Sequence, residues 1–399
     1  MRSFSITCFI GLACNCAAQV GAGEFLLPLT ANPAQFENDG AAARYSVVTV
    51  DTILLGTGFR DNFKYESRRP DTAKWDPDFG AVSSGVFINR SWAISPPNYG
   101  VCTFDGLNYI GNPYNVLASV NSTGQSDMLV SVPFNLSALS VSDSVYLSFW
   151  FQPEGRGYSP NPQDSLLLDF SAPSWSTTPT PVWKNIWFTE GFSPAAADSG
   201  FHIVMIKLDS ASYFANGFRF RFRNYAAQCG SNDHWHIDEV YMNRLRTFSD
   251  TLIDEASFVY DAPSFLKDYQ AMPFDHYKPS AHMAGSIGNI VRNAGPTAKN
   301  ITYKYDVFTS TGSNIATYTN TNAIGLAPFA YETYAPIANP PVYPTNFTSG
   351  FPQQSDSTYF LVRHQLLDLG RTDSMYFRQK FYNYYAYDDG TAEVGYGLN

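Results

Sequence analysis

Between residues 55 and 247 the chain consists of short runs in which apolar and polar side chains alternate, and turn residues separate these runs. Alternation with a period of two is typical of a strand with one buried face. The clearest runs span 85–89, 145–151, 165–170, 202–206 and 218–223. In the last run Phe alternates with Arg, so we expect the rings to enter a core and the guanidinium groups to line the opposite face. The pattern predicts a two-sheet sandwich over 55–247 with almost no helix.

A second β-rich region follows from 286 to 385. Its strand-like runs span 290–295, 301–307 and 359–362, and the region resembles an immunoglobulin-type sandwich. We interpret 248–285 as a connector, because Pro263, Pro273 and Pro279 interrupt it. The proline-rich residues 338–344 are expected to form a surface loop. The last residues, 386–399, have the pattern of a further domain that has only begun.

The N-terminal 18 residues have the features of a signal peptide. Arg2 supplies a basic start, residues 4–14 form a short apolar run, and small residues end at Ala18, the expected cleavage site. Lipidation at Cys14 and a retained anchor are the open alternatives, although the apolar run is too short to span a bilayer. Residues 19–54 form a loosely ordered lead-in. We therefore expect an exported protein, secreted or held on the outer cell surface.

Five cysteines are present, and three of them (Cys8, Cys14 and Cys16) fall in this leader. Cys102 and Cys229 remain in the mature chain. Either they form a disulfide in an oxidising compartment, or they are two separate buried thiols that pack as small hydrophobic side chains.

Composition narrows the classes of function. Only 15% of residues are charged, 16% are aromatic, and the net charge is −10. Such a surface repels phosphate backbones, and no stripe of Lys and Arg offsets it, so we expect no nucleic-acid partner. The sequence has no nucleophile-elbow, reactive-cysteine or phosphate-loop motif, and no apolar stretch long enough for a transmembrane helix. We expect no catalytic residues and no enzyme activity.

Two segments carry candidate binding chemistry. Trp175, Trp183 and Trp187 lie close together in sequence, and they either stack on sugar rings or fill the space between two sheets. In 233–238, a strand would place His234 and His236 on one face with Asp238, which is a possible transition-metal set. The favoured alternative is a structural strand with Trp235 and Ile237 in the core.

Three groups of segments together resemble a known family. They are Asn62, Phe63 and Trp75 with 85–90 and 96–107; 147–153 with 164–166; and 218–224 with 233–240. They look like the MAM-like, concanavalin-type jelly roll of large exported Bacteroidota proteins, and 384–393 is similar to a run in the same proteins. The resemblance implies an all-β fold, a jelly-roll sandwich followed by an immunoglobulin-like sandwich. It also implies carriage by the type IX secretion machinery, although the C-terminal sorting domain of such cargo is missing.

The resemblance further implies a structural calcium ion as the one possible cofactor. Hard cations prefer carboxylate and carbonyl oxygens, and in this sequence the candidate ligands are Asp238, Asp61, Asn62 and Asp105. The alternative is that these side chains cap turns and a strand edge.

The function that we expect is a non-catalytic binding or adhesion scaffold of the cell surface, which contacts glycans or surface proteins. Two alternatives stay open. One is a non-catalytic accessory region of a larger secreted hydrolase whose catalytic domain lies outside this chain. The other is a structural spacer with no ligand.

Overall fold

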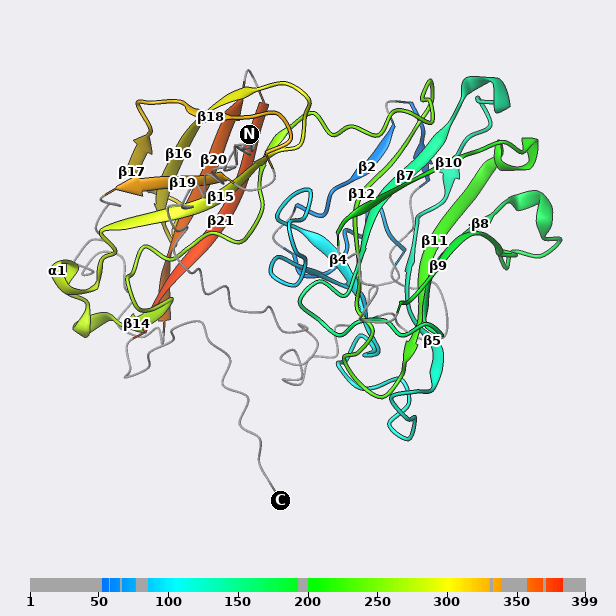
Figure 1. The fold of residues 1–399 in the computed structure, drawn as a ribbon, viewed down its shortest axis with the longest axis horizontal. Coiled ribbons are helices and arrows are strands. Elements are labelled where there is room, and N and C mark those ends of the chain that lie inside the picture. Colours follow the sequence, from blue (N-terminus) through cyan, green and yellow to red (C-terminus); the bar gives the residue numbers. More distant parts are fainter. Residues whose placement is uncertain are drawn as a thin grey trace, which may run out of the picture.

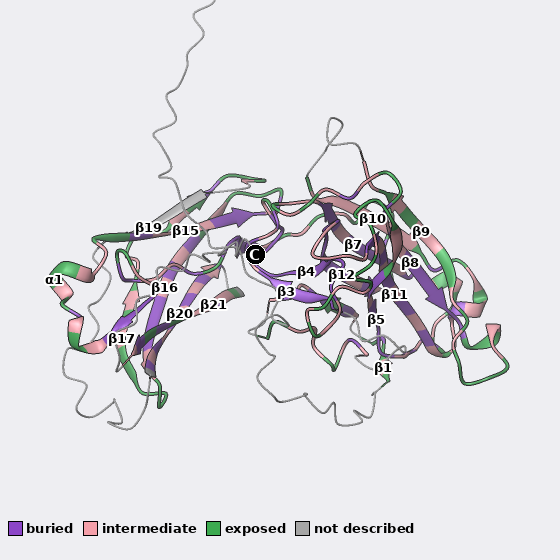
Figure 2. Cartoon of the chain, turned by 90° about the horizontal axis from the view of Figure 1, so that it is seen from below, coloured by how far each residue is buried: buried purple, intermediate pink, exposed green. Residues whose placement is uncertain are grey.

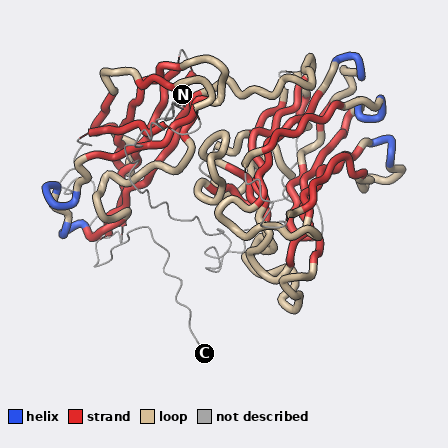
Figure 3. Tube along the Cα trace, viewed as in Figure 1, coloured by secondary structure: helices blue, strands red, loops and turns tan. Residues whose placement is uncertain are grey.

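The structure of the chain is a computed structural model that describes residues 52–56, 58–64, 67–76, 85–192, 200–330, 333–338, 357–368 and 371–382. The predicted signal peptide (1–18), nearly all of the lead-in (19–54), nearly all of the loop 338–344 and the segment 386–399 lie outside these residues. Strands form almost all of the regular structure (Figure 3). The helical turns are η2 (Val141–Asp143), η3 (Pro173–Trp175), η5 (Ala211–Tyr213), η6 (Phe274–His276) and α1 (Pro279–His282). In the part of the chain described here, no helix is both long and apolar enough to cross a membrane.

The first sandwich, which we define as residues 53–243, pairs two sheets around one core (Figure 1). The first sheet contains β1 (Ile53–Leu54), β6 (Phe134–Asn135), β11 (Asn216–Ala227), β8 (Ser165–Ser171) and β9 (Lys184–Glu190), with β5 (Thr123–Val130) also paired to β11. The second contains β10 (His202–Lys207), β7 (Tyr146–Pro153), β12 (Trp235–Asn243), β4 (Val101–Phe104) and β3 (Phe87–Asn89), with β2 (Phe59–Asp61) paired to β12. The predicted all-β class is confirmed, and the strands found by alternation are present.

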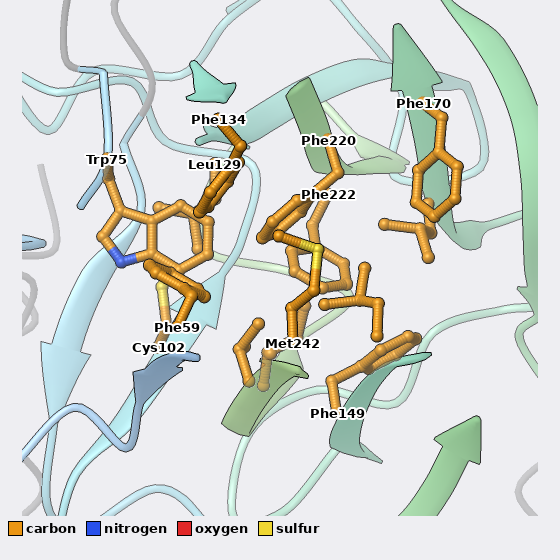
Figure 4. Packing of buried hydrophobic residues seen from close by; sticks show 14 of the residues in the cluster. Phe59, Trp75, Cys102, Leu129, Phe134, Phe149, Phe170, Phe220, Phe222 and Met242 are labelled. Carbon is orange, nitrogen blue, oxygen red and sulfur yellow. The ribbon is translucent and has the colours of Figure 1, made fainter. Parts of the chain in front are cut away.

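Strand β11 shows how alternation builds this core. Phe218, Phe220 and Phe222 are fully buried, while the arginines between them lie on the other side of the sheet. Figure 4 shows Phe220 and Phe222 within the cluster, and Trp75 meets the ring of Phe220 edge-on at 5.8 Å. Each large apolar side chain that is fully buried contributes about 1.5–3 kcal/mol. The ring-rich core is therefore a major source of stability for the first sandwich.

The second sandwich, which we define as residues 256–382, also encloses one hydrophobic core between two sheets. The smaller sheet contains β13 (Ala256–Phe258), β15 (Ser286–Asn293) and β19 (Thr333–Ala338). The larger contains β14 (Ala271–Pro273), β21 (Arg371–Tyr382), β20 (Ser357–Asp368), β16 (Lys299–Thr309) and β17 (Asn314–Thr319), with β18 (Ile324–Leu326) paired to β16. Figure 2 shows buried stretches of β15, β16 and β20 in purple.

The segment 248–285 differs from the connector that we predicted. It contributes β13, which pairs with β15, and β14, which pairs in parallel with β21. Phe258, Phe265 and Met272 from this segment are fully buried in the second core. Each of these strands has only three residues, which is too short for a period of two to be recognised, and Pro273 ends β14. Much of the segment is therefore part of the second sandwich.

A chain of hydrogen bonds crosses the second core. Asn289 donates through Nδ2 to the hydroxyl of Tyr303 (2.6 Å), and that hydroxyl is bonded to Nδ1 of His364. All three side chains are buried. Burial lowers the pKa of His364 to about 3, so its ring is neutral in the folded protein near neutral pH.

The loop before β4 docks the first sandwich onto the second. Tyr99 is buried with the apolar residues of the second core, and its hydroxyl donates to the carbonyl of Ser374 (3.0 Å). Arg292 of β15 donates through Nη1 to the carbonyl of Pro96 (2.8 Å), and Ser257 of β13 donates to that of Pro97 (2.9 Å). The two sandwiches thus share buried contacts rather than a flexible link.

A buried lysine completes this junction. Lys64 lies after β2, and its Nζ is 3.1 Å from Oε1 of Glu255 and 3.1 Å from Oδ1 of Asp373 in β21. Only 12% of its side chain is exposed. Burial alone would lower the pKa of Lys64, but the charges of Asp373 and Glu255 outweigh it and hold that pKa above its ordinary value. Lys64 therefore remains charged and bridges the two sandwiches.

Replacement of this lysine should destabilise the protein strongly. Lys64→Met removes the positive charge beside the mostly buried Asp373 and the partly exposed Glu255. The uncompensated Asp373 should lower the free energy of unfolding by about 3 kcal/mol. Chemical denaturation measures the change, and a further Asp373→Asn substitution should recover part of it. Lys207→Met, at an exposed lysine of β10, is the control and should change stability by about 0.5 kcal/mol or less. Equal stability of Lys64→Met and the unaltered chain would contradict this view.

His364→Phe should make the protein less sensitive to acid. An unfolded histidine takes up a proton as the pH falls through about 6.5, whereas folded His364 does so only near 3. Unfolding therefore takes up one proton between these values, so this residue lowers the free energy of unfolding by about 1.4 kcal/mol per pH unit as the pH falls. Urea unfolding of both proteins from about pH 7 to about pH 4.5 measures this slope. If the free energy of unfolding of the two proteins falls equally with pH, the proton taken up on unfolding does not belong to His364.

Candidate functional site

The strongest candidate site lies on the side of the β5, β11, β8 and β9 sheet that faces away from the first core. We call this surface the outer face. Arg219, Arg221, Arg223 and Tyr225 alternate with the buried residues of β11 and so project onto it. Asp169 of β8 stands opposite Arg221 in the register. The predicted division of Phe and Arg between two faces is confirmed, although nothing in the sequence singles out the arginines as a site.

Asp169 is the centre of the outer face. It accepts from Nε of Arg221 (2.9 Å) and from Nε of Arg223 (2.6 Å) at Oδ2, while Asn185 of β9 donates to Oδ1 (3.2 Å). Burial alone would raise the pKa of Asp169, but the hydrogen bonds and charges of the two arginines outweigh it, and the pKa lies below its ordinary value. The carboxylate therefore stays charged and keeps both guanidinium groups in place.

Aromatic rings cover part of this cluster. The guanidinium carbon of Arg221 lies 4.4 Å from the ring centre of Trp183, and that of Arg223 lies 5.1 Å from the ring of Tyr225. Trp183 is partly exposed, and Phe188 of β9 is 55% exposed. The outer face thus combines rings with fixed polar groups.

The three candidate tryptophans do not share one surface. Trp187 packs into the first core, where its ring meets those of Phe149 and Phe151 at 5.2 Å each. Trp175 packs at the border of the core, 5.8 Å from the ring of Tyr213. Only Trp183 lies on the outer face. The core-filling alternative therefore holds for Trp187 and largely for Trp175.

A bulge in β12 brings two acidic residues to one partner. Glu239 has φ of 51°, and the pairing of β12 with β7 shifts between Asp238 and Tyr241. Consequently Nδ2 of Asn98 lies 3.0 Å from Oδ2 of Asp238 and 3.1 Å from Oε1 of Glu239. Burial raises the pKa of both carboxyl groups, and the charge of Glu239 adds to the rise at Asp238. Nothing in the alternation of the sequence indicates this pairing.

His234 uses both of its ring nitrogens. The N–H of Tyr158 donates to Nδ1 (2.9 Å), so in the neutral ring Nε2 carries the hydrogen and donates to Oγ of Ser231 (3.1 Å). Ser231 in turn donates to Oδ2 of Asp105 (3.1 Å). These are the residue types of a hydrolase triad, but the ring gives a hydrogen to the hydroxyl and cannot accept one from it. Burial lowers the pKa of His234 to about 4.

His236 is also fully engaged. Its Nε2 lies 3.2 Å from the carbonyl of Glu154, which can only accept, so Nδ1 accepts from the hydroxyl of Thr103 (2.7 Å). Burial lowers the pKa of His236 to about 3. Trp235 and Ile237 are fully buried in the first core. The structural reading of this strand is therefore the better one, because no nitrogen lone pair remains to bind a transition metal.

The four candidate calcium ligands are Asp61, Asn62, Asp105 and Asp238. The three carboxylates have different partners: Asp61 accepts from Nζ of Lys74 (2.9 Å) and Nε1 of Trp75 (2.6 Å), Asp105 accepts from Ser231, and Asp238 accepts from Asn98. Among the described residues, no three His, Cys, Asp or Glu side chains are grouped to hold a metal ion. The calcium site stays a prediction, with Asp238 as its best single candidate ligand.

Of the two alternatives for Cys102 and Cys229, the disulfide is not formed. Cys102 is buried in β4 among the residues of the first core, and Cys229 lies in the turn after β11. Both are free cysteines. Burial raises the pKa of the Cys102 thiol, which keeps it protonated. The alternative of two separate thiols is correct, although Cys229 is only partly buried.

Comparison with known proteins assigns no family. No family model matches the chain, and no curated protein matches it. Solved structures with some likeness include a GH2 β-galacturonidase from Eisenbergiella tayi (TM-score 0.30, 11% identity, 81% of this chain and 43% of that one). Another is a Bacteroides uniformis β-glucuronidase (TM-score 0.27, 10% identity, 68% of this chain and 28% of that one). A third is Caldicellulosiruptor saccharolyticus CBM27-1 in complex with mannohexaose (TM-score 0.28, 11% identity, 46% of this chain and 97% of that one). The chain thus spans less than half of either enzyme.

Calcium at Asp238 is tested by thermal unfolding. A cation that binds only the folded chain raises the melting temperature by mass action. We expect a higher melting temperature in millimolar calcium than in chelator, and we expect Asp238→Asn to remove the difference. Asp268→Asn, at an exposed carboxylate that is not among the candidate ligands, is the control and should retain it. Equal melting temperatures for the unaltered chain would end the calcium prediction.

Proposed function

We propose that this chain is an exported, non-catalytic glycan-binding protein of the cell surface, and that the outer face of the first sandwich is its binding surface. The observation that carries the proposal is the ring of Trp183 held against the cluster of Arg221, Asp169 and Arg223. This arrangement offers a ring and fixed polar groups on the same side of one sheet.

Sugars have surfaces that match such a combination. A pyranose has an apolar face of C–H groups and a rim of hydroxyl groups. Trp183 and Phe188 offer rings on which the apolar face can rest. The guanidinium groups of Arg221 and Arg223, which are partly exposed, can donate hydrogen bonds to hydroxyl groups at the rim. Asp169 is buried beneath them and holds them in place.

The polar part of the outer face is fixed before a ligand arrives. Both arginines are tied to one carboxylate at 2.6–2.9 Å, and Asn185 ties the same carboxylate to β9. A binding surface whose side chains are already ordered loses less conformational entropy on binding. The low pKa of Asp169 supports this order in mildly acidic as well as neutral solution.

The same surface also suits the second candidate function, an accessory region of a larger secreted hydrolase. The observation that favours it is the docking of the two sandwiches through Tyr99 and Lys64, which makes them one stiff unit. In that case glycan binding is unchanged and the catalytic residues belong to another part of the protein.

Replacement of Trp183 tests the proposal. Affinity electrophoresis of the full chain in soluble galactomannan, xyloglucan, xylan and pectin should reveal at least one ligand, and calorimetry with matching oligosaccharides, mannohexaose among them, should give its affinity. Trp183→Ala should weaken that binding about tenfold or more, because a central ring is a large part of the contact.

Phe248→Ala is the matched control, since Phe248 is another exposed ring (71%) that lies outside the outer face. It should leave the affinity unchanged. Far-UV circular dichroism and urea unfolding show that each variant is folded. The proposal fails if none of the glycans binds, or if Trp183→Ala binds as tightly as the unaltered chain.

A further inference from the structure

The larger sheet of the second sandwich carries a pocket that the proposed function does not use. It is open, has a volume of about 260 Å³, and lies where the turn from β16 to β17 meets β20 and β21. Its lining consists of Phe308, Thr309, Ser310, Gly312, Tyr359, Leu361, Arg363 and Tyr376. We call it the second pocket. β16, β20 and β21 run side by side in Figure 1.

Alternation explains why the second pocket is rich in rings. Val307, Phe360 and Val362 point into the second core and are buried. Their neighbours Phe308, Tyr359, Leu361 and Arg363 therefore project from the opposite side of the sheet, away from that core. Leu361 pairs with Phe308 in the register and Tyr376 pairs with Arg363, so the lining side chains of three strands come together.

One arginine of the second pocket is held firmly in place. Nη2 of Arg363 lies 2.7 Å from Oδ2 of Asp306, and its guanidinium carbon lies 5.3 Å from the ring centre of Phe308. Thr317 donates to the other oxygen of Asp306 (2.7 Å), and Lys304 lies 3.3 Å from Oδ2. A third of the Arg363 side chain remains exposed. The guanidinium is thus oriented by the protein and still accessible to a ligand.

The surroundings of the second pocket are basic, although the whole chain has a net charge of −10. Lys304 and Arg363 on this side of the sheet are balanced by the single carboxylate of Asp306. Arg378 lies with its guanidinium carbon 5.3 Å from the ring centre of Tyr359, and Lys380 pairs with Tyr359 in the register. Arg378 and Lys380 are both exposed. Cations therefore exceed carboxylates here among the described side chains, and the local field favours an anion.

We infer that the second pocket binds a uronic acid residue of an acidic polysaccharide. The sugar ring rests on Tyr359 and Tyr376, and its carboxylate faces the guanidinium of Arg363, with Arg378 at the rim. Rings favour a ligand with an apolar face, the cations favour one negative charge, and the open shape lets a polymer continue on both sides. The inference takes its class of ligand from the proposed glycan binding, but it concerns a different sheet and different residues from the outer face.

Calorimetry of the full chain tests it with two probes, an oligogalacturonate trimer and an oligomannuronate trimer. At least one should bind, and the binding should weaken with added salt. Arg363→Gln should weaken it about tenfold, since it removes a charge-assisted hydrogen bond. Arg378→Gln should weaken it by about threefold to tenfold and serves as the second variant, because Arg378 is exposed and its replacement should change stability little. The methyl ester of the trimer, which lacks the charge, should bind far more weakly than the acid.

Trp183→Ala separates this site from the outer face, and it should bind the acidic trimer as the unaltered chain does. If Trp183→Ala instead abolishes the binding, acidic sugars bind on the outer face, and the inference falls while the proposed function stands. The inference is also overturned if neither trimer binds, if both arginine variants bind normally, if the ester binds as well as the acid, or if millimolar inorganic phosphate displaces the trimer. If neutral glycans fail to bind but the acid trimer binds as expected here, the outer-face proposal alone is lost.

Discussion

The arrangement of the two sandwiches depends on one charge that is kept out of water. Lys64 lies between the partly exposed Glu255 and the mostly buried Asp373, and without its charge the two carboxylates would lie close together with less compensation. Lys64 and Asp373 are mostly buried and Glu255 is partly exposed, and each would be costly without its opposite charge. Arg60 lies 3.5 Å from Glu255 and adds a second positive charge. The apolar contact of Tyr99 then adds to a junction whose polar groups are already satisfied. The outer face of the first sandwich and the second pocket therefore owe their relative position to this junction.

Much of the fold was predictable because burial on one side of a sheet leaves a period of two. The runs that became β7, β8, β11 and β16 show it plainly, and the all-β class follows from them. The short strands β13 and β14 were missed, since three residues give no period and their place comes from partners far along the chain. The jelly-roll and immunoglobulin-like topologies, and the likeness to MAM-like proteins, stay predictions.

The sites were less predictable, because they depend on which distant side chains meet. The sequence indicated Trp183, but not that it covers Arg221, nor that Trp187 faces the core instead. The sequence suggested Asp61 and Asp238 as ligands of one ion, but it did not indicate that Lys74 donates to the first and Asn98 to the second. Such pairings follow from bulges and registers, which single-sequence alternation does not reveal.

A stiff junction has a consequence for any long ligand. Two weak sites on separate, freely moving modules reach one another's ligand over a wide range of spacings, whereas sites on a rigid body accept only spacings near one value. Where a polymer has its sugars at that spacing, the second contact costs little additional entropy, and avidity exceeds either affinity alone. The ion pairs of Lys64 would then help to fix the distance between the two sites. The protein would select polysaccharides by the repeat distance of their sugars as well as by their chemistry.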